Sequence, residues 1–307
     1  NMERYYSLSS YLKNKFGVKV GKVCLDGGFT CPNRDGTLSN SGCIYCSERG
    51  SGEFAGCIGA KTISEQIAHQ KTMYGGKWKV EKYIAYFQNF TNTYKPVSEL
   101  RKIYDEALSD KDIVGLDIAT RADCMDLERI ELLKEYDEKT ETWIELGMQS
   151  IHEKTLDFIN RGYSHEYFDK KARELIDDGF KIIVHMILGL PTETREDMLE
   201  TFEYVKELHP FGVKIHSLYV DKHSRLGKLY TEKPFPVLTE EEYVNLVCDG
   251  MEILPRDIVY HRITGDPVRE NLIAPDWTKH KCAVISSIQK ELKRRNIDFV
   301  DGGRNEN

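Results

Sequence analysis

Three cysteines in the first quarter of the chain are the residues best suited to carry out chemistry. Cys31 is followed after eleven residues by Cys43 and Cys46, which are separated only by Ile44 and Tyr45. Four thiolates would complete a structural zinc site or an ordinary iron-sulfur cluster, whereas three leave one iron of a 4Fe-4S cube open to an outside ligand. An open iron supports catalysis, so this segment is the first candidate for a functional site.

The residue types around these cysteines leave three interpretations open. The thiols could hold an open 4Fe-4S cluster, could bind zinc with a fourth ligand from Cys24, Cys57 or a histidine, or could simply be buried. The segment 27–59 is rich in glycine, which lets backbone N–H groups approach cluster sulfurs and favours the cluster. Cys24 and Cys57 could each be a fourth ligand or a radical-relay thiol, and neither is assigned.

The overall charge restricts the partners that the protein can attract. Among 307 residues, 43 Lys and Arg stand against 50 Asp and Glu, which gives a net charge of −7. Such a chain has no general attraction to nucleic acid or to an anionic membrane, so a nucleic-acid partner would need a local basic face. No apolar run is long enough to cross a bilayer and the first residues lack a signal-peptide core, so we expect a cytoplasmic protein with no membrane partner.

Short apolar runs rich in β-formers alternate with helical patterns along most of the chain. The runs lie at 19–26, 83–87, 113–118, 142–146, 181–187 and 213–219. Two of the helical patterns, 164–178 and 194–208, end just before Gly179 and Pro210, as helices commonly do. This alternation predicts an α/β fold with a parallel sheet, and six units are too few for a closed eight-fold barrel. We therefore expect a partial (βα)6 barrel with its ligands at the carboxyl ends of the strands.

The pattern changes after Tyr230, where a Pro-containing linker at 233–236 is followed by a helix, a strand at 258–263 and a basic helix at 278–296. We expect two parts. Residues 1–230 would form the barrel with the N-terminal cysteine loop, and residues 231–307 would form a small C-terminal α/β extension that covers the barrel.

Several motifs resemble one known family. The pair Cys-x2-Cys with an aromatic residue before its last cysteine resembles that of radical S-adenosylmethionine (SAM) enzymes. The motifs Thr-Arg-Ala-Asp at 120–123, Ile-Glu-Leu-Gly-Met-Gln-Ser at 144–150, Ile-Asn-Arg-Gly at 159–162 and His-Met-Ile-Leu-Gly-Leu-Pro at 185–191 resemble, in the same order, the radical SAM core of Elongator's catalytic subunit. With the tail segments 264–267 and 291–296, the resemblance is closest to the smaller YhcC/YtqA branch.

This resemblance implies a set of cofactors and the residues that hold them. In the family, three cysteines hold a 4Fe-4S cluster, SAM chelates the open iron, and electron transfer cleaves SAM to methionine and a 5′-deoxyadenosyl radical. The implied cluster ligands are Cys31, Cys43 and Cys46, and the implied SAM-binding residues are Tyr45, Gln88, Asn89, Gln149, Arg161 and His185. No residue is assigned as catalytic.

The match to the family is uneven from one residue to the next. Gln149 and Arg161 match residues that bind the SAM carboxylate end, and Tyr45 takes the aromatic position beside the adenine. Residues 88–89 replace the two glycines that usually meet the SAM amino group, and Ala119 replaces the usual glutamate after the third strand. The contacts at these two places must therefore come from other atoms.

The resemblance also suggests a substrate. Elongator's catalytic subunit acts at C5 of the wobble uridine of tRNA, and this chain has no obvious acetyltransferase segment. We expect conversion of 5-carboxymethylaminomethyluridine to 5-aminomethyluridine in tRNA, an electron donor such as flavodoxin or ferredoxin, and a downstream methyltransferase. The alternatives are a radical SAM enzyme acting on a small metabolite or a protein, which the negative charge favours, and a non-catalytic zinc or iron-sulfur binding module.

Overall fold

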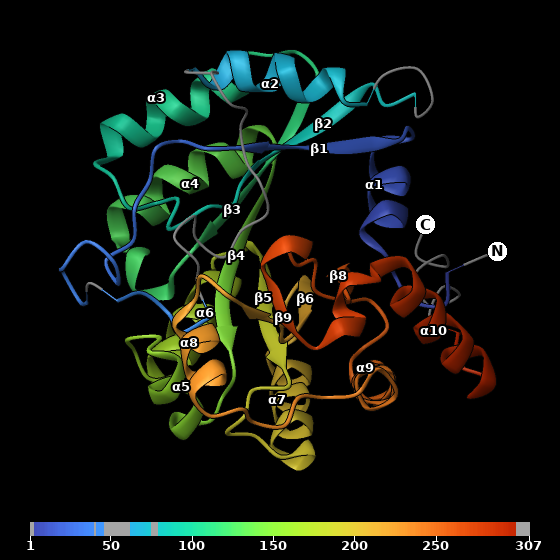
Figure 1. The fold of residues 1–307 in the computed structure, drawn as a ribbon. Coiled ribbons are helices and arrows are strands. Elements are labelled where there is room, and N and C mark those ends of the chain that lie inside the picture. The colour runs from blue at the N-terminus through green and yellow to red at the C-terminus, as the bar shows by residue number, and fades with distance from the viewer. Residues whose placement is uncertain (1–2, 40, 46–61, 75–78, 299–307) are drawn as a thin grey trace.

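A curled sheet of seven parallel strands forms the centre of the molecule (Figure 1). The computed structural model describes residues 3–39, 41–45, 62–74 and 79–298. The strands follow the order β1 (Val20–Leu25), β2 (Lys82–Phe87), β3 (Ile113–Thr120), β4 (Glu141–Gln149), β5 (Lys181–Leu188), β6 (Gly212–Ser217) and β8 (Val259–Arg262). Because β1 and β8 are both edge strands, the sheet is a half-barrel that stays open along one side.

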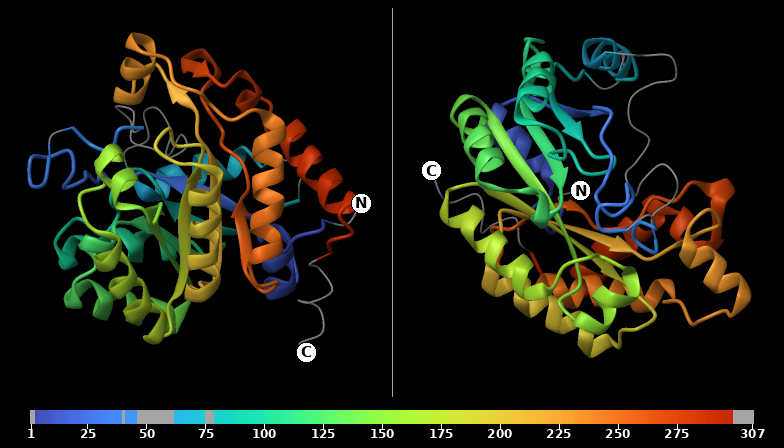
Figure 2. Two further views of the ribbon diagram at one scale, coloured as in Figure 1. Left: turned by 90° about the horizontal axis from the view of Figure 1, so that it is seen from below. Right: turned by 90° about the vertical axis from the view of Figure 1, so that its left-hand side faces the viewer.

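Helices cover the convex face of this sheet (Figure 2). They are α2 (Ile63–Thr72), α3 (Val97–Leu108), α4 (Leu127–Lys139), α6 (His165–Asp177), α7 (Arg195–Leu208) and α9 (Glu240–Ile253). Of the remaining helices, α1 (Leu8–Phe16) precedes the first strand, α5 (Glu153–Ile159) and α8 (Arg225–Glu232) share an apolar cluster with Ile44, and α10 (Lys281–Arg294) packs on α9. A two-stranded antiparallel ribbon joins β7 (Val220–Asp221) to β9 (Leu272–Ala274).

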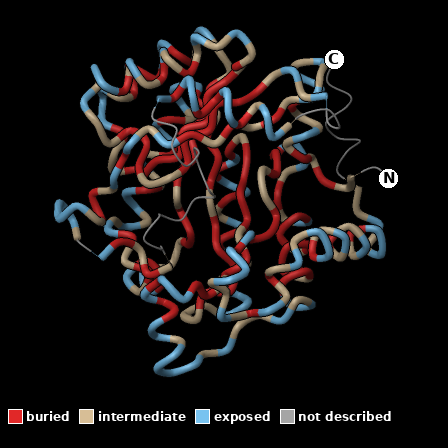
Figure 3. The backbone as a smooth tube through the Cα atoms, turned by 45° about the horizontal axis from the view of Figure 1, so that its top comes forward, coloured by how far each residue is buried: buried red, intermediate tan, exposed pale blue. Residues whose placement is uncertain are grey.

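The strands have two chemically different faces. On β5, Ile182, Val184 and Met186 pack into the large core beneath the helices, whereas Ile183 and His185 alternate with them on the concave face. Since successive side chains of a strand point to opposite faces, the run at 181–188 contributes side chains both to the helix-covered core and to the concave face. The strands are the most continuously buried part of the chain (Figure 3).

The amino end of the barrel is closed by α1. Leu12 packs with Ile84, Trp143 and Ile183 in a separate apolar cluster on the concave side of the sheet. Ligands can therefore approach the interior from the carboxyl ends of the strands or from the open side between β1 and β8.

The open side is partly covered by the first residues of the chain and by α10. Ser7 forms a parallel bridge with Tyr260 of β8, and the Tyr260 N–H donates to the carbonyl of Tyr6 at 2.8 Å. The backbone N–H of Arg4 donates to Gln289 Oε1 of α10 at 3.0 Å. Segments from opposite ends of the chain thus lie side by side here.

The predicted fold class is confirmed: six βα strands form a partial barrel, and a C-terminal extension follows it. The strand of that extension joins the main sheet as β8, paired with β6. The predicted helix at 278–296 is split into a 3-10 turn at Asp276–Lys279 and α10, with His280 outside the helical conformation between them. No helix within the described residues is long and apolar enough to span a membrane.

The packing of α9 on α7 can be tested at Gly250. A Cβ atom at this position would lie 2.3 Å from the ring of buried Phe202, so Gly250→Ala must displace that ring. We expect the free energy of unfolding to fall by about 1–3 kcal/mol, measured by urea denaturation, although alanine favours helix more than glycine does. Adding Phe202→Leu should restore part of the loss. A Gly250→Ala variant as stable as the parent would contradict this packing.

Candidate active site

A pocket opens where the carboxyl ends of β1 to β5 converge, and we name it the cysteine pocket. It is lined by Cys31, Arg34, Gly42, Cys43 and Tyr45 from the loop after β1, by Gln88, Phe90 and Thr91 after β2, by Ala119, Thr120 and Arg121 at the end of β3, and by Glu145, Gly147, Gln149, Arg161 and His185. Side chains from five successive strands or the loops after them thus meet at one place, as expected for the carboxyl edge of a parallel sheet.

Two of the three predicted cluster cysteines lie in this pocket. Cys31 and Cys43 both line it, and a turn at Cys31 is held by N–H groups of residues 34 and 35, which donate to its carbonyl at 2.9 and 3.0 Å. Cys46 and Cys57 lie outside the described residues. Cys24 lines a different cavity, between β1 and β8.

The loop that carries Cys43 is fixed to the helices around it. The N–H of Ile44 donates to the carbonyl of Ile159 at 2.9 Å, and the carbonyl of Ile44 accepts from the N–H of Leu226 in α8 at 2.9 Å. These three side chains belong to one apolar cluster. The cluster shields one side of the cysteine loop from water.

A hydrogen-bond donor lies close to the Cys43 sulfur. Asn33 Nδ2 is 3.7 Å from Cys43 Sγ and donates to the Asn160 carbonyl at 2.6 Å. Asn160, in the left-handed region at φ 57°, donates from its own side chain to the carbonyl of Gly42 at 2.9 Å. Burial raises the pKa of the Cys43 thiol, while Arg121 and Asn33 act in the opposite direction. A bound metal would replace the thiol proton, and the amide would then stabilise the thiolate.

Arg161 is a buried cation beside this pocket. Its Nη1 donates to the Met148 carbonyl at 2.7 Å, its Nη2 donates to the Tyr163 carbonyl at 2.9 Å, and only 2% of the residue is exposed. Burial lowers the pKa of the guanidinium, and no carboxylate among the described residues forms an ion pair with it. The guanidinium has five N–H donors and uses three here, so it can still bind an anion.

Gln149 brings a buried acceptor to the same pocket. A bulge ends β4 between Gly147 and Gln149, and Gln149 adopts φ +67°, a conformation that few residues other than glycine take. A Cβ at Gly147 would lie 3.0 Å from Gln149 Nε2, so the glycine leaves room for the amide. Gln149 Oε1 is buried without a partner in the described structure. It is therefore free to accept a hydrogen bond from a ligand.

The other predicted SAM-binding residues divide into two groups. Tyr45, Gln88 and His185 line the cysteine pocket, whereas Asn89 follows Gln88 without belonging to the lining.

The His185 and His216 rings lie 5.9 Å apart, and burial lowers the pKa of His216 to about 3, so this second ring is neutral at physiological pH.

Glu145 is a pocket residue that we did not predict. It pairs in register with Ala119 of β3, so a carboxylate from β4 lies beside the position where the family glutamate is missing. Glu145 Oε1 accepts from His185 Nε2 and, at 3.0 Å, from Lys214 Nζ. A glutamate inside an apolar strand run was the signal available in the sequence.

Charged side chains continue below the pocket on the concave face. Lys22, Tyr86, Asp117, Glu145 and Lys214, which we name the charged layer, are linked by hydrogen bonds, among them Lys22 Nζ to Asp117 Oδ2 at 3.2 Å and the Tyr86 hydroxyl to Glu145 Oε1 at 3.1 Å.

Asp117 and Glu145 are the two carboxyl groups of this layer, and each affects the pKa of the other. Each has one buried oxygen, Asp117 Oδ1 and Glu145 Oε2, without a hydrogen-bond partner in the described structure. Burial raises the pKa of Asp117 well above its ordinary value, and Glu145 adds to this. Burial acts on Glu145 in the same sense, but Lys214 and the hydrogen bonds outweigh it and hold the Glu145 pKa well below its ordinary value. Asp117 is therefore the carboxyl group of this layer that keeps its proton, and Glu145 is the one that is ionised.

Comparison with known proteins identifies the family of this chain. The profile of the radical SAM superfamily matches residues 36–205. The chain belongs to the radical SAM superfamily. The profile of the radical SAM C-terminal domain matches residues 210–294, which carry β8, α9 and α10.

The relatives of this radical SAM chain include two bacterial proteins of similar length. YtqA of Bacillus subtilis is 43% identical over 293 residues, covering 95% of this chain and 91% of YtqA. YhcC of Escherichia coli is 34% identical over 294 residues, covering 95% and 94%. A tRNA uridine(34) acetyltransferase of Methanocaldococcus infernus is 30% identical over 176 residues, covering 56% of this chain and 32% of that protein. The chain thus belongs to the YhcC/YtqA branch.

Solved structures agree on the radical SAM fold. The Methanocaldococcus infernus Elp3 structure has a TM-score of 0.66 at 18% identity, and the match covers 91% of this chain and 63% of the Elp3 chain. Streptococcus suis SuiB bound to S-adenosylmethionine has a TM-score of 0.51 at 12% identity, covering 84% of this chain and 54% of SuiB.

The cysteine pocket fits the cofactors of a radical SAM enzyme, which are a 4Fe-4S cluster and SAM. Cys31 and Cys43 supply thiolates, and Asn33 directs an N–H at one sulfur. The amino-acid end of SAM carries one ammonium and one carboxylate. Gln149 Oε1 offers an acceptor without a partner in the described structure, and Arg161 offers a cation without a carboxylate there. The polar groups left over in this pocket thus match the charges of that ligand.

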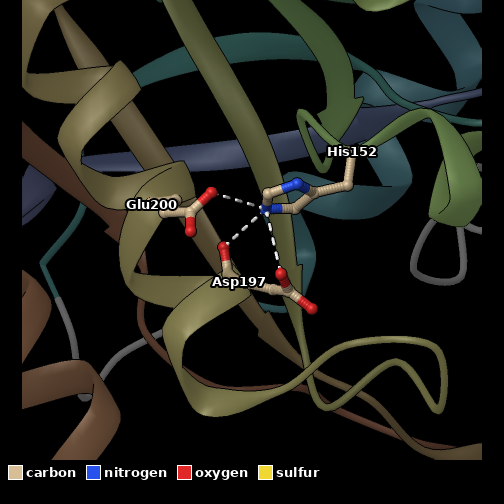
Figure 4. A group of neighbouring side chains, drawn as sticks. All are labelled: His152, Asp197 and Glu200. Atoms are coloured by element: carbon tan, nitrogen blue, oxygen red, sulfur yellow. Dashed lines mark hydrogen bonds and ion pairs between the residues drawn. The ribbon is translucent and has the colours of Figure 1, made fainter.

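A second group of potential metal ligands lies at the start of α7. Figure 4 shows His152, Asp197 and Glu200 facing one another. His152 Nε2 donates to the Asp197 carbonyl at 2.9 Å, and Asp197 Oδ2 accepts from Lys154 Nζ at 2.7 Å and from the Thr194 N–H at 2.9 Å. Asp197 caps the helix together with Thr194 and also binds Lys154, so its oxygens already have partners without a metal.

The raised pKa of Asp117 predicts an unusual pH dependence of stability. Because the Asp117 pKa is raised in the folded state, its stabilising effect is complete below the unfolded value near ~3.9 and is lost as pH rises toward the folded value. Between pH 5 and pH 8 the parent should lose up to about 1.4 kcal/mol per pH unit relative to Asp117→Asn, which keeps a permanent donor. Urea denaturation at several pH values measures this difference.

Asp112→Asn is the matched control for this experiment. The Lys71 ammonium lowers the Asp112 pKa, so this group stays ionised across the same range and its removal should leave the shape of the profile unchanged. Parallel profiles for Asp117→Asn and the parent would show that Asp117 does not hold the proton.

Proposed function

We propose that this radical SAM enzyme holds its cluster through Cys31, Cys43 and Cys46 and modifies the wobble uridine of tRNA. The observation that carries the cofactor assignment is the convergence in one pocket of Cys31 and Cys43 with an unpaired buried acceptor on Gln149 and a buried cation on Arg161. When bound, the cluster and SAM together supply a 5′-deoxyadenosyl radical for hydrogen abstraction.

The residues of the pocket have separate tasks in this proposal. Arg161 binds the SAM carboxylate, Gln149 accepts from the amino group, and Tyr45 lies against the adenine. Gln88 and His185 complete the SAM contacts, and Asn89 acts through Gln88 because it lies next to that residue and outside the lining.

The barrel keeps water away from the reacting atoms. The concave face is closed at one end by α1 and beside the cysteine loop by the apolar cluster that includes Ile44, Ile159 and Leu226. A primary-carbon radical reacts with any nearby C–H bond, so a closed and ordered site is a condition for selective hydrogen abstraction.

The relatives support tRNA as the substrate. Proteins named tRNA uridine(34) acetyltransferase are 30% and 29% identical to this chain over 56% and 55% of its length. Our proposal is the conversion of 5-carboxymethylaminomethyluridine to 5-aminomethyluridine, with flavodoxin or ferredoxin as electron donor and a methyltransferase that consumes the primary amine.

A substitution at Arg161 can test SAM binding separately from folding. Arg161→Lys keeps a positive charge but loses the planar fork, so we expect SAM affinity to fall about tenfold or more while iron content is retained. Equilibrium dialysis with SAM on anaerobically reconstituted protein measures the affinity, and iron analysis is the control. The exposed Arg173 on α6 is the control, and Arg173→Gln should alter neither quantity. Unchanged SAM affinity with reduced thermal stability would make Arg161 a purely structural residue.

The whole proposal is tested by mass spectrometry of tRNA nucleosides. Reconstituted enzyme, SAM and a reductant should convert 5-carboxymethylaminomethyluridine in tRNA to 5-aminomethyluridine, and Cys43→Ala should abolish the conversion. SAM cleavage with unchanged tRNA would point instead to a small-molecule or protein substrate. One zinc per chain in place of about four irons would support a non-catalytic binding module.

A further inference from the structure

A group of cations lies on the surface along α8. Between residues 222 and 233 the chain carries three lysines, one arginine and one histidine against a single acid, Glu232. Lys222, Arg225, Lys228 and Lys233 are all exposed, and we name these four residues the cationic strip. In a chain with a net charge of −7, a nucleic-acid partner needs such a local excess of positive charge.

The charges of the strip are not compensated by carboxylates within the described residues. No described carboxylate forms an ion pair with any of its four members. Asp221, the acid directly before the strip, is buried, and its Oδ1 accepts from the N–H of His223 at 2.7 Å. The end of α10, which is also basic in sequence, differs in this respect. There Arg294 and Arg295 both pair with Glu291, at 2.6 and 2.9 Å.

The strip adjoins a wall of the cysteine pocket. Arg225 Nη2 donates to the carbonyl of Gly42 at 2.7 Å, and Gly42 lines the pocket next to Cys43. The N–H of Leu226 donates to the carbonyl of Ile44 at 2.9 Å, which fixes α8 to the same loop. In Figure 1 this orange helix lies beside α5, with which it shares an apolar cluster. A polymer bound along the strip therefore lies next to the site, and one of its groups can enter the pocket while others stay on the strip.

The cations of the strip are spread along the whole helix. Arg225 and Lys228 are three residues apart in α8, so they share one face with Cβ atoms about 5–6 Å apart. Lys222 lies before the N-cap Ser224, and Lys233 is the C-cap. The helix between them has 8 residues and is therefore about 12 Å long. Such a row matches a repeated anion, as in a nucleic-acid backbone, better than it matches one small ligand.

Apolar and aromatic side chains accompany these cations. Leu229, directly after Lys228, is 41% exposed. Tyr230 and Phe235 meet edge to face with ring centroids 5.0 Å apart, and both are only half-buried. Accessible rings beside cations are typical of surfaces that bind single-stranded nucleic acid, where bases stack and phosphates meet cations. An acidic protein needs the charges alone, so this combination favours RNA.

We propose that the cationic strip binds the phosphate backbone of the tRNA loop whose base enters the cysteine pocket. This inference rests on the proposed function and deepens it, because it names the surface that holds the RNA while the pocket holds the reacting nucleoside. It also explains how a chain with a net charge of −7 can bind a polyanion, since the attraction is concentrated on one short helix.

The experiment measures the affinity of the reconstituted enzyme for transcribed tRNA by filter binding at several salt concentrations. The double variant Lys222→Gln with Lys228→Gln loses two phosphate contacts, so we expect about tenfold weaker binding at low salt. The slope of log affinity against log salt should become less steep by about 1.4, because each contact to a single strand contributes roughly 0.7. SAM affinity and iron content should equal those of the parent, since neither lysine lines the cysteine pocket.

Lys170 on α6 and Lys206 on α7 provide the matched control. Both are exposed, neither forms an ion pair with a described carboxylate, and their helices cover the convex face of the sheet. Lys170→Gln with Lys206→Gln removes the same charge and should leave the affinity and its salt slope close to those of the parent. Arg225 is kept unchanged because it also holds the carbonyl of Gly42.

Lysine footprinting on the unaltered chain locates the RNA without relying on a variant. Acetylation by an N-hydroxysuccinimide ester, followed by mass spectrometry, should slow at Lys222 and Lys228 when tRNA is present. The rates at Lys170 and Lys206 should stay the same. The melting temperature of the double variant checks that it is folded, and the footprint decides the matter if it is not.

Binding and turnover fail separately in this design. Binding of tRNA with protection of Lys222 and Lys228, but without nucleoside conversion, would uphold the strip and overturn the proposed reaction. Conversion with an unchanged KM for tRNA in the double variant would uphold the reaction and overturn the strip. A parent-like affinity and salt slope in that variant, or equal acetylation with and without tRNA, would also overturn the strip. Binding of poly-L-glutamate but not of tRNA through the same lysines would make the partner an acidic protein and overturn the RNA assignment.

Discussion

The two faces of each strand impose the constraint on which the rest of the structure depends. Alternate side chains of a curved parallel sheet must enter either the helix-covered core or the barrel interior. On β4 the first set is Ile144, Leu146 and Met148, while Glu145 occupies the interior. A strand that appears apolar in sequence therefore delivers a polar side chain to the site, and its position is determined by register.

Buried charge is the cost of such an interior, and the structure limits it by pairing. Glu145 accepts hydrogen bonds from His185 and Lys214, and the raised pKa of Asp117 avoids a second buried negative charge. Breaking one member of a buried charged network usually destabilises a protein more than the network stabilises it. A change of charge at one member of the charged layer therefore affects the others, including Glu145 in the cysteine pocket.

The sequence was informative wherever chemistry depended on local spacing. The strands and the half-barrel were predicted correctly, and Cys31, Cys43, Gln149 and Arg161 come together as expected at the carboxyl edge. These residues are far apart in the sequence. The repeated βα units bring them together, because each unit places the end of its strand at the same edge of the sheet.

The remaining features of the site depend on contacts that no local pattern encodes. The side chain of Asn33 is held by its hydrogen bond to the carbonyl of Asn160. Glu145 faces the pocket because β4 pairs with β3 in the register that places it beside Ala119. The cavity that Cys24 lines needs β1 and β8 in one place, although these strands are more than 200 residues apart in the chain. Even Cys24, conspicuous in sequence, could be separated from the cluster cysteines only by locating its cavity.

The seam formed by residues 4–7 with β8 and α10 has a consequence for biosynthesis. Residues 4–7 dock against elements that are synthesised more than 250 residues later, so the side of the barrel stays unsealed until β8 and α10 have been made. During that interval Lys22, Asp117 and their neighbours remain hydrated, and their desolvation is postponed until those elements dock. Enclosure of the reactive interior is thereby linked to the synthesis of β8 and α10.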